Sequence, residues 1–143
     1  MSTVMISAQD HADIHNLYAL YNLASDAGDA ETYAGCFTED GALEVQPRGL
    51  LVRGRPALVD YKNADKAGRG TLYRRHWNAS LHLARIDATT VAGRAYYAGY
   101  NGEPGKLPSM TSCGVYEDRL TQGADGGWRF AHRLLLIDGR ADA

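Results

Sequence analysis

Residues 73–83, Tyr-Arg-Arg-His-Trp-Asn-Ala-Ser-Leu-His-Leu, constrain the fold more than any other stretch of this sequence. Aromatic and apolar residues alternate there with polar ones, and this period of two is typical of a β-strand. Because successive side chains of a strand point to opposite faces, one face is predicted to carry Tyr73, Trp77, Ala79, Leu81 and Leu83, and the other Arg74, His76, Asn78, Ser80 and His82. The second face suits the wall of a polar pocket. The alternative is a solvated sheet face with incidental histidines.

Three helices are predicted before this strand. Residues 8–27 carry apolar side chains at intervals of three and four, with Ser7 placed to cap the start and Gly28 to end the helix. A shorter helix is predicted from Asp29 to about Phe37. The third begins around Pro56, since proline is tolerated in the first helical turn, and runs to about residue 65.

Strands follow the helices along the chain. Two short strands are predicted at 42–45 and 50–52, between the second and third helices. Long strands are predicted at 72–86, 90–100, 110–120 and 128–137. Helices followed by long antiparallel strands indicate an α+β domain. We expect residues 1–143 to form one domain, a cone-shaped α+β barrel in which three N-terminal helices pack in a strongly curved, mostly antiparallel sheet. The His76 row would line its cavity.

Composition excludes several classes of function. The formal net charge is −2 and the basic residues form no long run, which disfavours nucleic acid and anionic membranes as partners. No apolar run approaches the roughly 20 residues that span a bilayer, and the N-terminus lacks the pattern of a signal peptide. The two cysteines, Cys36 and Cys113, form no disulfide framework or zinc pattern. We therefore expect a cytoplasmic protein without metal, nucleotide or flavin.

A set of short motifs is distributed over nearly the whole chain. It comprises Tyr21, residues 26–29 (Asp-Ala-Gly-Asp), 36–41 (Cys-Phe-Thr-Glu-Asp-Gly), 54–58 (Gly-Arg-Pro-Ala-Leu), 75–76 (Arg-His), 114–118 (Gly-Val-Tyr-Glu-Asp) and 128–130 (Trp-Arg-Phe). As a set, these residues resemble the SnoaL-like branch of the nuclear transport factor 2-like superfamily. The closest functional resemblance is to its dehydratase-type group, which includes scytalone dehydratase, bile acid 7α-dehydratase and hexachlorocyclohexane dehydrochlorinase. The resemblance implies one deep pocket and frequent dimers.

The resemblance also implies a catalytic pair. Members of the group combine an aspartate late in the first helix with a histidine early in a long strand, and Asp26 and His76 fall at those places. A neutral imidazole can remove a proton at neutral pH, and a carboxylate on its other nitrogen would fix the tautomer. We expect these side chains to be hydrogen bonded, with Asp26 raising the pKa of His76. The alternative is a purely structural bond between helix and sheet.

Other polar and aromatic residues are candidates for the pocket. Tyr21 matches a family tyrosine and would be a third catalytic residue, donating a hydrogen bond to a substrate oxygen; otherwise it is a core tyrosine. The predicted substrate-binding residues are Tyr18, Asn78, Tyr96, Tyr97, Tyr116 and Arg133. Arg133 would pair with Asp26 or with an anionic substrate group, or else form an ordinary surface ion pair. His11 and His15 have the spacing of a helical metal pair, but the first turns of a helix usually face solvent.

These features favour a cofactor-independent lyase of the dehydratase type, acting on a ring-containing, aromatic or polycyclic small molecule. Two alternatives remain open. The same pocket could serve an isomerase or a polyketide-type cyclase, or the domain could bind a small ligand without catalysis. A buried Asp–His pair at the pocket would favour catalysis, and an apolar lining would favour binding. We also expect a homodimer or higher homo-oligomer, formed through the outer sheet face with Trp77, Ala79, Leu81 and Val115.

Overall fold

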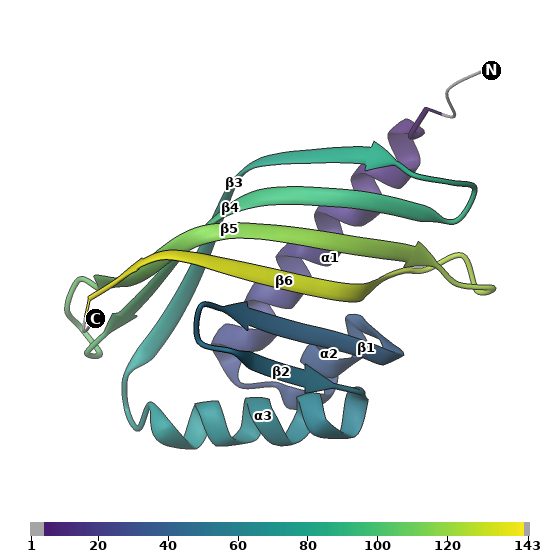
Figure 1. Cartoon of the computed structure of the whole chain (residues 1–143). Coiled ribbons are helices and arrows are strands. Elements are labelled where there is room, and N and C mark those ends of the chain that lie inside the picture. The colour runs from purple at the N-terminus through teal and green to yellow at the C-terminus, as the bar shows by residue number, and fades with distance from the viewer. Residues whose placement is uncertain (1–4, 142–143) are drawn as a thin grey trace.

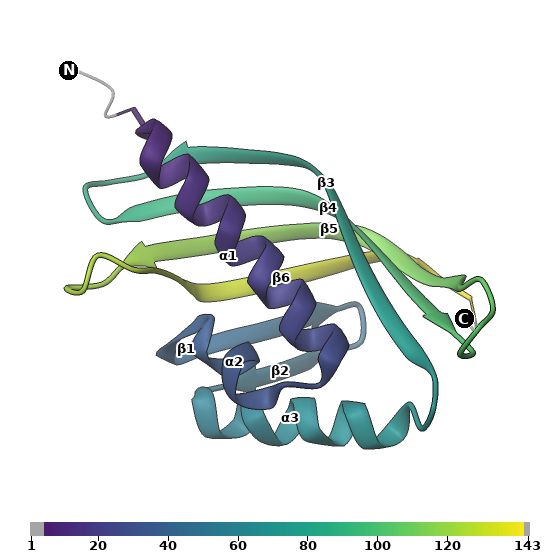
Figure 2. The ribbon, with the colours of Figure 1, turned by 180° about the vertical axis from the view of Figure 1, so that it is seen from behind.

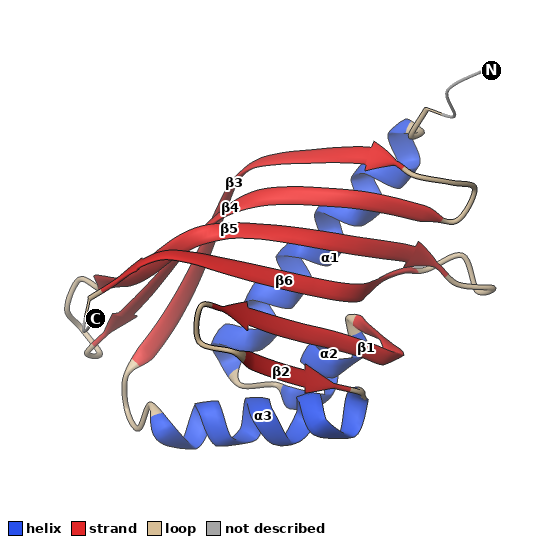
Figure 3. Cartoon of the chain, viewed as in Figure 1, coloured by secondary structure: helices blue, strands red, loops and turns tan. Residues whose placement is uncertain are grey.

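The computed structural model describes residues 5–141. Helices α1 (Ala8–Ala27), α2 (Ala30–Gly35) and α3 (Arg55–Gly68) precede most of the sheet in the chain. The strands are β1 (Phe37–Gln46), β2 (Leu50–Arg53), β3 (Tyr73–Arg85), β4 (Thr90–Gly102), β5 (Ser109–Gln122) and β6 (Trp128–Arg140). Figure 3 separates the helices, in blue, from this sheet, in red. The predicted α+β class is confirmed.

A single six-stranded sheet has the order β2-β1-β6-β5-β4-β3, and all neighbours are antiparallel except β1 and β6. Strands β3, β4 and β5 bend sharply about midway along their length (Figure 1). Helix α1 crosses the face of the sheet that this bend makes concave, as Figure 2 shows from behind, and α3 runs beside β2. The C-terminal end of α1, α3 and the strands of the sheet all contribute residues that line one cavity.

The core lies between α1 and the sheet. Ile14 and Tyr21 of α1 pack with Phe37 of β1, Leu120 of β5 and Phe130 of β6, and all five are buried. This confirms the apolar stripe that the sequence predicted for residues 8–27. The predicted helix ends are also confirmed: the Ser7 hydroxyl accepts a hydrogen bond from the Asp10 backbone N–H, and Gly28 adopts the left-handed conformation that favours glycine.

The second helix is shorter than predicted and the first strand is longer. Phe37 lies in β1 instead of α2, and residues 39–41 (Glu-Asp-Gly), whose types are common in turns, lie within the strand. The pairing of β1 with β6 shifts register between Phe37 and Ala42, so the turn-forming residues make an irregularity inside the strand. Gly41 fits there because a Cβ atom would lie 2.8 Å from the Phe130 carbonyl oxygen.

Strand β3 departs from simple alternation. Its pairing with β4 shifts register between Ala79 and His82, and Ser80 has φ of 57°. This bulge exchanges the faces, so Leu81 and Leu83 pack against the core on the same side as His76, whereas Ser80 and His82 are exposed. The sequence prediction that His76, Ser80 and His82 share one face is wrong, because an extra residue inverts the pattern.

No helix in residues 5–141 is long and apolar enough to cross a membrane.

Candidate active site

A cavity of about 500 Å³ lies between α3, the C-terminal end of α1 and the concave side of the sheet. This volume is in the range of small-molecule sites. Its apolar and aromatic wall consists of Tyr21, Tyr33, Leu43, Val45, Tyr61, Tyr97, Tyr116, Leu135 and Ile137. Its charged and polar side includes Arg48, Lys62, Asp65, Arg74, His76, Asn101, Ser112 and Arg140. The cavity therefore suits a molecule with both a ring-like body and polar substituents.

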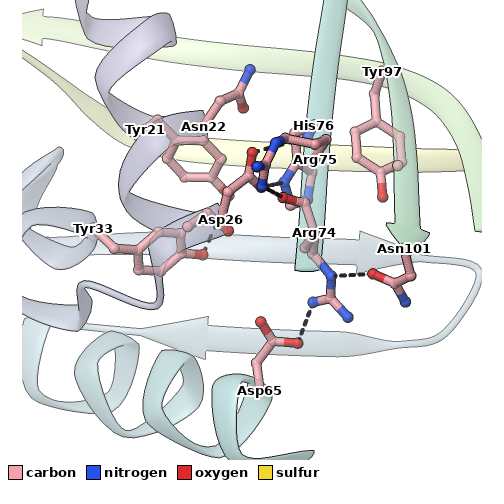
Figure 4. Close-up of polar contacts among 12 residues, drawn as sticks. Tyr21, Asn22, Asp26, Tyr33, Asp65, Arg74, Arg75, His76, Tyr97 and Asn101 are labelled. Carbon is pink, nitrogen blue, oxygen red and sulfur yellow. Dashed lines mark hydrogen bonds and ion pairs between the residues drawn. The ribbon is translucent and has the colours of Figure 1, made fainter. Parts of the chain in front are cut away.

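Asp26 and His76 meet at the wall of this cavity. The Asp26 carboxylate accepts a hydrogen bond from the His76 backbone N–H at 3.1 Å, and its other oxygen lies 2.5 Å from ring Nδ1 of His76. Figure 4 shows both dashed contacts between the end of α1 and β3. A carboxylate on Nδ1 favours the tautomer with its proton there. Nε2 is then the basic nitrogen, on a side chain that lines the cavity.

The end of α1 is held in place by α3. The Arg69 guanidinium donates to the carbonyl oxygens of Ser25 at 2.9 Å and Asp26 at 2.8 Å. These are among the last carbonyls of the helix, which have no partner within it. The Lys62 ammonium group also donates to the Ser25 hydroxyl at 2.8 Å. The backbone that carries Asp26 is therefore fixed before any ligand binds.

The pKa of His76 is lowered from its ordinary value, which corrects the direction predicted from the sequence. Burial disfavours the charged ring and is the largest influence; the hydrogen bond and charge of Asp26 oppose it, and Lys62 and Arg74 lower the pKa further. The sequence pattern identified the carboxylate but not the burial or the two cations. A lowered pKa keeps the ring neutral, and able to accept a proton, at neutral pH.

Tyr21 also lies at the cavity wall. Its hydroxyl is 3.3 Å from the Tyr33 hydroxyl, and its ring packs among aromatic neighbours. Burial, followed by the influence of Tyr33, raises the pKa of Tyr21 well above its ordinary value. The phenol is therefore protonated across the physiological range and can donate a hydrogen bond but cannot act as a base.

Two of the predicted substrate-binding tyrosines line the cavity. Tyr97 packs beside His76, with ring centroids 5.6 Å apart, and its hydroxyl is 2.8 Å from the Ser112 hydroxyl. Tyr116 lies next to Tyr97 and Tyr21 at the buried end. Both residues come from the central strands β4 and β5.

Arg133 and Tyr18 were predicted to bind substrate, but they lie in the core and not among the cavity-lining residues. Arg133 is fully buried and forms an ion pair with Asp118, with Nε–Oδ1 and Nη2–Oδ2 distances of 3.0 and 3.1 Å. The Tyr18 hydroxyl donates to the same carboxylate. Arg133 therefore does not pair with Asp26, and its ion pair is buried instead of lying on the surface.

Asn78 and Tyr96 are also outside the cavity lining. Asn78 accepts a hydrogen bond from the Asn22 side chain at 2.8 Å, which joins β3 to α1. Tyr96 is 60% exposed, because neighbouring Tyr97 takes the inward position and alternation turns Tyr96 to the outer face. The prediction that these two side chains line the pocket is wrong.

A charged network centred on Asp65 was missed at the sequence level. The Asp65 carboxylate binds Lys62 at 3.1 Å, Arg69 at 2.9 Å and Arg74 at 2.5 Å. Burial alone would raise its pKa, but Lys62 and Arg74 outweigh burial and hold the pKa of Asp65 at about 2. The only available signal was Arg74, two residues before His76 on the same predicted strand face. Which face of α3 meets the sheet is decided by tertiary packing.

No group of three or more His, Cys, Asp or Glu side chains suited to a metal ion occurs within residues 5–141. His11 and His15 lie with their ring centroids 6.4 Å apart on the exposed start of α1. No further potential ligand joins this pair among the described residues.

Comparisons with solved structures agree with this architecture. Rv3472(D26N), a protein of unknown function from Mycobacterium tuberculosis, is 34% identical with a TM-score of 0.81, and the match covers 94% of this chain and 75% of that one. A Catenulispora acidiphila protein in complex with S-DNPA is 26% identical with a TM-score of 0.80, covering 92% of this chain and 96% of that one.

A third structure, of a candidate scytalone dehydratase from Novosphingobium aromaticivorans, is 19% identical with a TM-score of 0.79. The match covers 94% of this chain and 88% of that one, and at this identity it bears on the fold alone. No curated protein matches the sequence. The model of the SnoaL-like domain matches residues 7–134, most of the chain and all of its helices. The chain therefore belongs to the SnoaL-like domain family.

Proposed function

We propose that this protein is a cofactor-independent lyase of the dehydratase type, in which His76 is the general base and Asp26 orients it. The observation that carries the proposal is the Asp26–His76 pair at the cavity wall, with Nδ1 bonded to the carboxylate. A neutral imidazole with a lowered pKa is a competent base at neutral pH. A cavity built only to hold an apolar ligand would not need this pair.

In the proposed reaction, His76 Nε2 removes a proton from an acidic C–H bond of the substrate. The electron pair of that bond forms a carbon–carbon double bond as a leaving group departs from the adjacent carbon. Asp26 stabilises the resulting imidazolium. The Tyr21 phenol, which stays protonated, can donate a hydrogen bond to the departing oxygen, and the imidazolium can return its proton so that water leaves.

The substrate is proposed to be a ring-containing small molecule, because Tyr21, Tyr97 and Tyr116 supply an aromatic wall in a cavity of about 500 Å³. Isomerisation or polyketide-type cyclisation would begin with the same proton removal. Elimination is favoured here because a hydrogen-bond donor, Tyr21, accompanies the base.

Replacing Asp26 with asparagine should change both the rate and the pH dependence. A suitable probe is 5-nitrobenzisoxazole, a ring compound from which a base removes a C–H proton while the N–O bond breaks to give a coloured phenolate. We expect the rate of the Asp26→Asn variant to fall by at least about tenfold. This loss should be smaller than the rate loss on removing the base itself, which is about 10²–10⁴-fold. Removing the carboxylate also removes the two influences that raise the pKa of His76, so the acid limb should move to lower pH.

The measurement is the rate of phenolate formation between about pH 4 and pH 8, across the ordinary histidine pKa. Wild-type activity should fall on acidification through a midpoint below 6.5, since the protonated ring cannot accept a proton. Asp13→Asn removes a carboxylate on the exposed part of α1 and should leave the profile unchanged. An unchanged profile in Asp26→Asn would mean that Asp26 does not act on the base.

A dimer through the outer sheet face belongs to the same proposal. Trp77 and Tyr96 are 57% and 60% exposed, and Trp77 packs beside Tyr100 with ring centroids 4.5 Å apart and the rings tilted. Leu81 does not contribute to this face as predicted, because the bulge turns it toward the core. The double variant Trp77→Glu/Tyr96→Lys should be monomeric by light scattering at a concentration at which the wild type is dimeric. A monomeric wild type at micromolar concentration would contradict the dimer.

A further inference from the structure

The cavity carries an excess of positive charge that the proposed proton transfer does not use. Among the described residues that line it, Arg48, Lys62 and Arg74 are cationic and Asp65 is the only carboxylate. Counting Asp26 behind His76 still leaves more positive than negative groups. Because the whole chain has a net charge of −2, this excess is local to the cavity.

Asp65 cannot neutralise this side of the cavity alone. Its two carboxylate oxygens are shared by Lys62, Arg69 and Arg74, so three cations surround one anion. The ion pairs lie between the half-buried Asp65 and the nearly buried Lys62 and Arg69. Cations with little access to water attract a ligand anion more strongly than surface lysines do.

Arg74 is fixed with one nitrogen available. Its Nε donates to Asn101 Oδ1 at 3.0 Å and its Nη1 to Asp65 at 2.5 Å, which sets the plane of the guanidinium from two sides. Figure 4 shows this group below His76, between Asp65 and Asn101. Nη2 of Arg74 donates no hydrogen bond to another of the described residues. An arginine held in this way is preorganised to bind an anionic oxygen.

Arg48 supplies a second cation from another element. It lies in the turn between β1 and β2, lines the same cavity, and forms no ion pair or hydrogen bond with another residue of the described chain. Burial raises the pKa of Tyr61, and Asp65 adds to this, while Arg48 and Arg74 both oppose it. Both arginines therefore influence the Tyr61 hydroxyl, Arg48 from the turn between β1 and β2 and Arg74 from β3.

We propose that the substrate is an organic anion whose anionic oxygens bind Arg48 and Arg74 Nη2 while its ring reaches His76. Arg74 and His76 are two residues apart on one face of β3, a separation of about 7 Å along the strand. A carboxylate attached to a ring system spans this interval. The inference rests on the proposed function, because it takes the cavity as the place of reaction and adds the class of substrate.

The test is a binding measurement with 2-naphthoate and 2-naphthamide, which have nearly the same shape but differ in charge. Isothermal calorimetry or ligand-observed NMR should give wild-type protein at least about a tenfold preference for the carboxylate, equivalent to about 1.4 kcal/mol. Arg48→Gln should lose most of this preference without a folding defect, since Arg48 is exposed. Arg129→Gln makes the same charge change at the start of β6, outside the cavity lining, and should keep the preference.

Arg74→Gln should also lose the preference, and circular dichroism would show whether the loss of its two partners affects the fold. Equal affinities for the two ligands in wild-type protein, no saturable naphthoate binding, or an undiminished preference in Arg48→Gln would each overturn the inference. Because binding needs no turnover, His76→Gln should keep the preference. Wild-type protein that prefers naphthoate but does not accelerate proton removal from 5-nitrobenzisoxazole would contradict the proposed lyase and would still support the anion site.

Discussion

Replacing His76 with glutamine is expected to slow proton abstraction from 5-nitrobenzisoxazole by about 10²–10⁴-fold, the usual contribution of a positioned general base. Glutamine retains polarity and similar size and can still donate to Asp26, but it has no nitrogen that accepts a proton at neutral pH. The remaining rate should be independent of pH through the histidine range. The measurement is the initial rate of phenolate release, at equal concentrations of folded protein.

His82→Gln is the matched control for this variant. His82 lies on the same strand beyond the bulge, is exposed, and does not line the cavity, so its replacement should leave the rate within about twofold of the wild type. Unchanged circular dichroism would exclude unfolding as the cause of a loss in His76→Gln. A His76→Gln rate within about threefold of wild type, well short of the effect of losing a base, would rule out the proposed mechanism.

Replacing Asp118 with alanine is expected to lower the free energy of unfolding by about 3–5 kcal/mol, because it leaves a buried arginine without its carboxylate. Burial favours loss of the Arg133 proton, but Asp118 and the surrounding tyrosines outweigh burial and raise the pKa of Arg133. The guanidinium carbon also lies 3.5 Å from the centre of the Tyr116 ring. The charge therefore persists in the core, and without Asp118 it has no anionic partner there.

Urea unfolding at neutral pH measures this loss, and two further variants identify its cause. Glu117→Ala breaks the neighbouring Glu117–Arg94 pair, which is largely exposed, and should cost no more than about 1 kcal/mol. Asp118→Ala/Arg133→Leu removes both charges and should be more stable than Asp118→Ala alone. A double variant that is no more stable than Asp118→Ala alone would show that an unpaired charge is not the main cost.

Much of the fold could be predicted from local sequence signals. The interval of apolar residues along 8–27, the cap at Ser7 and the stop at Gly28 are all local, and each is confirmed. The four long strands were also predicted close to their observed bounds, because their alternation and the intervening turn residues are properties of short segments. The order of these elements then limited the fold to an α+β class.

The irregular strands could not be predicted in this way. In β3, the alternation of residues 77–83 continues unbroken in the sequence, but the bulge at Ser80 exchanges the faces. Leu81 and Leu83 gain burial in the core through this exchange. The alternation in the sequence does not indicate where a bulge inserts an extra residue. The bulge is seen only in the register of the pairing with β4.

The candidate site divides along the same line. The Asp26–His76 contact followed from the family resemblance, and the hydrogen bond is present. The direction of the His76 pKa did not follow, because it depends on burial and on Lys62, which reaches the site from α3. The Arg133–Asp118 ion pair could not be predicted for a similar reason. Each is a charged residue in an alternating strand, and only the pairing of β5 with β6 brings them together.

The state of the His76 ring tests the central claim most directly and needs no substrate. Long-range nitrogen–proton NMR of protein labelled with ¹⁵N-histidine reports which ring nitrogen carries the proton and the pKa at which the second is added. We predict a neutral ring at pH 7 with the proton on Nδ1, an unprotonated Nε2, and a pKa below the ordinary value of 6.5. A ring with its proton on Nε2, or one that is still charged at pH 7, would contradict the assignment of His76 as the base.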